Sequence, residues 1–151
     1  MDREAIIDHP FLLHPMFKGA QIMYSWREFE HQKGEYDFSI LKEDYEYLKK
    51  FGKKIFLQLQ DATFNRKYKA LPDYLFTKEY GGGATLQYDN EGKPEGRVAK
   101  RWNKKVRGCF ALLLQELRKE HDGKIEGINL KETSIGISSK TDTSFSEQRY
   151  I

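Results

Sequence analysis

The sequence contains little of what several classes of protein require. It has one cysteine, Cys109, so an internal disulfide is excluded. It has no apolar run near the length of a membrane span, and we expect no membrane partner. The first seventeen residues hold early acids and two prolines, which is not typical of a signal peptide, and the compartment stays open.

Motifs for metals and nucleotides are also missing. The four histidines, His9, His14, His31 and His121, have no metal-ligand spacing. The glycine-rich run YGGGAT lacks the Lys-Ser/Thr of a phosphate-binding loop, which favours a turn. Cys109 lies near the apolar stripe of an expected helix, where a buried, inert thiol is expected. The sequence therefore predicts no cofactor and no metal site.

Aromatic residues are plentiful in this chain: 10 Phe, 9 Tyr and 2 Trp among 151 residues. The length suits one domain with a core, and many of these rings must lie in that core. Rings that reach the surface suit ligands with flat apolar faces, including sugars and bases. The net charge of +3 arises from 26 basic and 23 acidic residues, which favours nucleic acid only weakly.

The order of expected elements indicates an α/β fold. Strands are predicted at residues 19–26, 53–61 and 124–130, and helices at residues 39–51 and from Asn103 to about Gly123. Residues 1–18 form an irregular lead-in. Strands separated by helices need crossover connections and therefore a parallel sheet. Three strands fit either a small open α/β domain or one piece of a larger barrel.

Residues 62–101 are predicted to be one long loop. Loops of this length in a domain are functional or disordered. Because function in parallel α/β barrels gathers at the C-terminal ends of the strands, we expect this segment at that end. Tyr68, Tyr74 and Trp102 flank it and are candidates for lining a cleft or for local packing.

The second strand carries the first candidate site residues. Ile55, Leu57 and Leu59 share one face, while Phe56, Gln58 and Gln60 share the other. Two glutamines are unusual on a buried parallel strand, and they suit the inside of a barrel near a polar mouth. Asp61 is predicted to cap the strand end.

One stretch resembles the clan A glycoside hydrolases, which have (β/α)8 barrels. In that family a strand ends in Trp, a hydrophobic-Glu-Pro run follows, and Gly-x-Tyr-Asp-Phe-Ser opens a helix. The matching residues here are Trp26, Phe29, Glu30, Gly34, Tyr36, Asp37, Phe38, Ser39, Gly52 and Lys53, with His31 in place of Pro. Residues 71–75, LPDYL, resemble a Pro-x-Trp-Leu element after the family's third strand.

The resemblance implies a single partial TIM (β/α)8 barrel domain over residues 1–151, with about three β/α units that match the second to fourth barrel strands. The fourth strand of these enzymes ends in an acid/base glutamate, which Glu132 matches. The family's nucleophile lies on its seventh strand, so this chain alone lacks half of the active site. The parent would hydrolyse O-glycosidic bonds of an oligo- or polysaccharide. The remaining barrel strands would then be its partners.

Four further residues are predicted to contact the carbohydrate: Trp26, Gln58, Gln60 and Asn129. Trp26 is equally well explained as a core aromatic, and Asn129 as a residue paired with backbone. Glu126, in the middle of the third strand, is predicted to pack or to form an ion pair.

Two other functions remain open. Lys131 stands where the family has Asn, which favours a carbohydrate-binding barrel that has lost catalysis. A small basic module for nucleic acid is the third hypothesis, although a solvated surface explains its basic residues better. These are Lys53, Lys54, Lys67, Lys69, Lys100, Arg101, Lys104 and Lys105.

Overall fold

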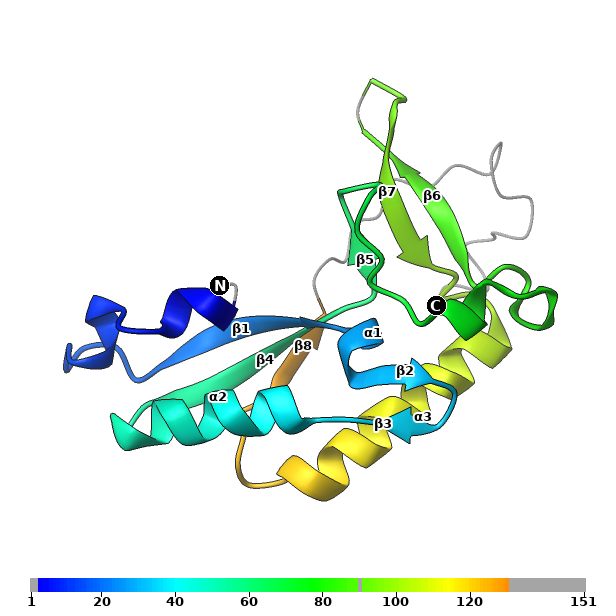
Figure 1. Cartoon of the computed structure of the whole chain (residues 1–151). Helices are drawn as coiled ribbons and strands as arrows, with labels where there is room; N and C mark the ends of the chain where they lie inside the picture. The colour runs from blue at the N-terminus through cyan, green and yellow to red at the C-terminus, as the bar shows by residue number, and fades with distance from the viewer. Residues whose placement is uncertain (1–2, 90, 131–151) are drawn as a thin grey trace.

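The computed structural model of the chain describes residues 3–89 and 91–130. A parallel sheet lies at its centre (Figure 1). Its strands are β1 (Gly19–Ser25), β4 (Lys54–Gln60) and β8 (Ile128–Leu130), in the order β1-β4-β8, and both neighbouring pairs are parallel. The prediction of an α/β fold with a parallel sheet is confirmed.

The third strand is shorter than predicted. Residues 124–127 are not part of the strand, although Glu126 N and Gly127 O already bond to Ile55 O and Leu57 N of β4. The side chain of Glu126 forms an ion pair with Lys54 at 2.9 Å. An ion pair was one of the two roles predicted for this residue. Regular pairing of β8 therefore begins only at Ile128.

Two long helices cover one face of this sheet, α2 (Ser39–Lys50) and α3 (Lys104–His121). The Asn103 side chain accepts hydrogen bonds from Lys105 N and Val106 N and so caps α3, whose start at this residue agrees with the prediction. The short helix α1 (Trp26–Phe29) follows β1 directly. Within the residues that the structure describes, no helix combines the length and apolar character needed to cross a membrane.

The alternation of side chains along β4 sets the two faces of the sheet. Ile55, Leu57 and Leu59 are fully buried on the helical side, whereas Phe56 is 37% exposed and Gln58 half-buried on the other side. The register pairs Ile22 with Leu57 and Tyr24 with Leu59, so β1 buries the same face. The predicted alternation of β4 side chains between two faces is confirmed.

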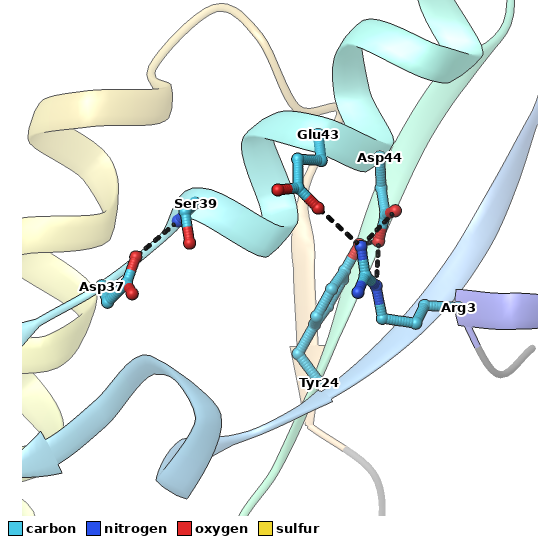
Figure 2. Close-up of polar contacts among 6 residues, drawn as sticks. All are labelled: Arg3, Tyr24, Asp37, Ser39, Glu43 and Asp44. Carbon is cyan, nitrogen blue, oxygen red and sulfur yellow. Dashed lines mark hydrogen bonds and ion pairs between the residues drawn. The ribbon is translucent and has the colours of Figure 1, made fainter.

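The segment between β1 and α2 is more ordered than a polar loop. After α1 it forms a hairpin of β2 (Glu30–Gln32) and β3 (Glu35–Tyr36), and Gly34 supplies the positive φ of 78° that the turn needs. Asp37 then accepts a hydrogen bond from Ser39 N at 2.8 Å where α2 begins (Figure 2). This bond lowers the pKa of the Asp37 carboxyl.

The prediction of one long loop at residues 62–101 was wrong. This segment folds into an antiparallel sheet of β5 (Ala62–Thr63), β7 (Pro94–Ala99) and β6 (Ala84–Tyr88), in that order. Two 3-10 turns, η3 (Asp73–Phe76) and η4 (Lys78–Tyr80), precede β6. Short strands interrupted by glycines do not show a clear period of two, which is why the sequence concealed them.

The predicted position of this segment is nevertheless confirmed. The antiparallel sheet lies beyond the C-terminal end of β4 (Figure 1). The Arg101 guanidinium binds both oxygens of Asp61, with Nε and Nη2 each at 2.7 Å, and Ala99 N donates to Asp61 O at 2.9 Å. Asp61 therefore fixes the end of β7 against the end of β4.

The lead-in at residues 1–18 includes two 3-10 turns, η1 (Arg3–Ile6) and η2 (Pro10–Leu12). Arg3 of η1 binds Asp44 of α2 through Nε at 3.1 Å and Nη2 at 3.0 Å (Figure 2). The Tyr24 hydroxyl donates to the same carboxylate at 2.6 Å. Burial, with the neighbouring Asp44 carboxylate, raises the pKa of Tyr24.

We expect Tyr24→Phe to lower the free energy of unfolding by about 1–3 kcal/mol, because it removes a buried hydrogen bond to a charged acceptor. Urea denaturation measures the change. Tyr88→Phe is the matched control on a half-buried tyrosine of β6. Equal stability of the two variants would contradict a role for the Tyr24 hydroxyl.

Candidate functional site

Polar side chains gather on the sheet face that the helices leave uncovered. The register places Met23, Gln58 and Asn129 side by side across β1, β4 and β8. Ser25 and Gln60 form the next row, at the C-terminal ends of β1 and β4. The structure thus brings Gln58, Gln60 and Asn129 together on one face.

Two of these amides have unmet or weak hydrogen bonding. Asn129 Oδ1 is buried and has no hydrogen-bond partner within residues 3–89 and 91–130. Gln60, 8% exposed, donates from Nε2 to the sulfur of Met23 at 3.0 Å, and a thioether is a weak acceptor. Both groups would gain from a polar ligand on this face.

Trp26 does not share that face. It begins α1, and its side chain is fully buried against Phe110 of α3, with ring centroids 5.0 Å apart. The expectation of a sugar-stacking platform is therefore corrected to its alternative, a core aromatic, because in this position the indole presents no ring face to solvent.

The Trp26 indole is held by a buried carboxylate. Glu30, 1% exposed, accepts from Trp26 Nε1 at 2.7 Å on one oxygen. Its other oxygen accepts from Gly34 N at 2.8 Å and from the Tyr74 hydroxyl at 3.0 Å. Three donors converge on this site, and a carboxylate suits it because both of its oxygens only accept.

The same carboxylate affects the neighbouring phenols. Burial, and then the charge of Glu30, raise the pKa of Tyr36 to about 12. Burial and Glu30 also raise the pKa of Tyr74. Glu30 therefore fastens the β2-β3 hairpin and η3 to α1 through charge and hydrogen bonds together.

We expect Glu30→Gln to destabilise the chain by about 1–3 kcal/mol, because the amide nitrogen would face a donor instead of accepting from it. Chemical denaturation measures the stability, followed by the combined fluorescence of Trp26 and Trp102. Glu35→Gln, at an exposed position of the same hairpin, is the control. Unchanged stability of Glu30→Gln would show that the three donors find other partners.

A polar hollow of about 620 Å³ opens near the C-terminal ends of β1 and β4. It is lined by Arg3, Glu4, Met23, Glu28, Gln60, Thr63, Phe64, Asn65 and Tyr68. Its size lies within the range of small-molecule sites. Phe64 and Tyr68 are 40% and 43% exposed, so aromatic surface borders its polar groups.

Sequence reasoning identified Gln60 and Tyr68 but missed the other residues of this hollow. Glu28 had a readable signal, since Ser25-x-x-Glu28 after a strand has the spacing of a helix capping box. The structure contains that box, with Ser25 N and Oγ both 2.7 Å from Glu28 Oε2. Residues 63–65 lie in the segment that was predicted to be a loop, and no comparable motif marks them in the sequence.

Two other hollows adjoin one another on the helical side of β8. One, of about 380 Å³, is lined by Trp26, Asp61, Arg101 and apolar side chains of α3, and the other measures about 540 Å³. Phe110, Leu114 and Leu130 belong to both. Phe110 and Leu114 are only half-buried, and both line these hollows.

Glu132, the predicted acid/base, lies outside the described residues. In the described part of the chain no group of three or more His, Cys, Asp or Glu side chains is placed to hold a metal ion. Cys109 is buried, as its predicted role as an inert thiol required.

Several of the basic residues considered for nucleic acid are engaged within the protein. Lys54 pairs with Glu126, Lys69 with Asp73 and Arg101 with Asp61. Lys53 donates to the carbonyls of His14 and Phe17. These contacts use much of that positive charge in holding the fold together.

Comparison with known proteins finds similarity at the level of structure. No protein-family model matches the sequence, and no curated protein matches it. The β-galactosidase from Rahnella sp. R3 has a similar fold, with a TM-score of 0.52 and 19% identity over 86% of this chain and 20% of the enzyme. The β-galactosidase from Bacillus circulans sp. alkalophilus gives 0.52 and 18% over 78% of this chain and 17% of the enzyme.

The chain spans about a fifth of the length of these solved structures. At such low identity the likeness concerns the fold, which is thus similar to part of a glycoside hydrolase.

Proposed function

We propose that this chain is the second-to-fourth-strand part of a glycoside-hydrolase barrel, and that the complete protein hydrolyses O-glycosidic bonds of an oligo- or polysaccharide. The observation that carries the proposal is the parallel order β1-β4-β8 in a fold similar to part of two β-galactosidases. The gathering of Gln58, Gln60 and Asn129 on the uncovered face supports it.

The apolar hollows beside β8 support the partial barrel. β8 bonds to β4 on one side, and no strand pairs with its other edge within the described residues. Ile128 and Leu130 are 37% and 42% exposed next to the half-buried Phe110 and Leu114. A further β/α unit would pair with that edge and cover these side chains.

Catalysis would need two carboxylates, which lie about 5–5.5 Å apart in a retaining enzyme. We propose Glu132 as the general acid/base, on its match to the family's fourth strand. Two residues after β8, it follows a strand whose C-terminal end lies beside that of β4. The nucleophile would come from another part of the complete barrel.

A carbohydrate-binding barrel without catalysis is the second candidate. The observation that favours it is Lys131, at the position where the resembling enzymes carry Asn. Binding without turnover by the complete protein would support this alternative.

In a complete, active parent we expect Glu132→Gln to reduce hydrolysis of natural substrates by about 10²–10⁴-fold, because it removes the proton donor and keeps the shape. Activated aryl glycosides, whose leaving groups need no protonation, should be affected less. Steady-state kinetics on both substrates measures the difference, and glycan binding should persist. Unchanged hydrolysis of natural substrates would sink the assignment of Glu132.

We expect the chain of 151 residues alone to self-associate or to be only marginally stable, because both edges of its parallel sheet lack a partner strand in the described structure. Sedimentation velocity and thermal unfolding measure these properties. A monomer with a cooperative transition at high temperature would argue strongly against the partial barrel.

A further inference from the structure

We propose that the polar hollow beside η1 is a subsite for a neutral sugar ring, with Glu28 accepting hydrogen bonds from sugar hydroxyls and Tyr68 packing against the ring. The proposal rests on the carbohydrate-binding function proposed above. It extends the site around the predicted contact residue Gln60 to Glu28 and Tyr68, which the resemblance did not assign, at the ends of β1 and β4.

Glu28 is prepared for this role by its own helix cap. Its Oε2 accepts hydrogen bonds from Ser25 N and Ser25 Oγ, each at 2.7 Å, and these bonds fix the side-chain rotamer. Its Oε1 receives no hydrogen bond within the described residues, and the side chain lines the hollow. A carboxylate already held in place loses little conformational entropy when a ligand hydroxyl binds it.

Gln60 adds a complementary donor on the floor of the hollow. Its amide Nε2 now bonds to the Met23 sulfur, which is a weak acceptor, so a hydroxyl oxygen would be a better partner. The site thus offers a carboxylate acceptor, an amide donor and exposed aromatic rings within one hollow. A sugar ring has the matching surface, with hydroxyls at its rim and C–H groups on its faces.

The charges of the lining residues favour a neutral sugar over an acidic one. Arg3 is the cation that lines the hollow, and its guanidinium already binds Asp44 and Glu43. Glu4 and Glu28 both line the hollow and would repel a uronate carboxylate. Arg66 and Lys67 belong to the adjoining loop but do not line the hollow.

The test titrates the chain with lactose and cellobiose as neutral disaccharides and with digalacturonate as an acidic one. Backbone amide NMR shifts locate binding, and calorimetry measures affinity. We expect at least one neutral disaccharide to shift the amides of Thr63 and Asn65, with digalacturonate binding more weakly or not at all.

Glu28→Gln is the decisive variant. The glutamine oxygen can still accept both hydrogen bonds from Ser25, while its NH2 group, a donor, replaces the oxygen Oε1 that would accept from the sugar. We expect it to weaken neutral binding about tenfold, the usual scale for losing a charge-assisted hydrogen bond. Tyr68→Ala, which leaves the cap intact, should weaken it too. Glu46→Gln, at an exposed position of α2 outside the hollow, should not.

The outcomes separate this inference from the function on which it rests. Neutral binding that shifts only amides around Gln58 and Asn129, and that survives Glu28→Gln, would overturn the subsite and leave the carbohydrate function standing. Tighter binding of digalacturonate in the hollow would overturn the choice of a neutral sugar. If none of the three disaccharides shifts any amide, the subsite proposal fails, whereas the function of the complete protein is decided by its own hydrolysis assay.

Discussion

The rest of this structure depends on the parallel pairing of β4 with a strand on each side. That pairing aligns the C-terminal ends of three strands at one edge, and the period of two along β4 assigns each side chain to one of two faces. One face is filled by Ile55, Leu57 and Leu59 against the helices. The amides of Gln58 and Asn129 are therefore left together on the opposite face, without any need for them to be near in sequence.

The surface hollows differ in chemistry according to their place in this arrangement. Those beside β8 combine the side of α3 with a strand edge that has no partner among residues 3–89 and 91–130, and their shared residues are the apolar Phe110, Leu114 and Leu130. The hollow beside η1 mixes carboxylates, amides and aromatic rings. Apolar surface next to an exposed strand edge suits another strand and helix, whereas mixed lining suits a small polar ligand.

Much of the parallel core could be predicted from the sequence, because β1, β4, α2 and α3 carry strong periodic patterns and clear caps. The antiparallel sheet could not, since β5 has two residues and Gly96 lies within β7. A Cβ at Gly96 would come within 1.8 Å of Thr63 O, so close packing of β5 on β7 requires a residue that is also typical of loops.

The burial of Trp26 was hidden for a related reason. A tryptophan at the end of a barrel strand can point toward a ligand or toward the helices, and the sequence does not distinguish these directions. The deciding contact is the bond from its indole to Glu30, four residues later, which a one-turn helix brings within 2.7 Å. Neither residue type alone predicts that α1 begins at position 26 instead of the strand continuing.

The carboxylates near the C-terminal edge of the sheet differ in how many of their oxygens accept hydrogen bonds. Glu30 receives three donors and Asp61 receives both arms of Arg101, so both oxygens of each carboxylate already accept a hydrogen bond. Glu28 uses one oxygen in its cap and keeps the other toward the polar hollow. Acid/base chemistry needs a carboxyl group that can exchange its proton with the substrate. Glu30 and Asp61 thus hold α1, the hairpin and β7 in place, whereas Glu28 is suited to binding a ligand hydroxyl.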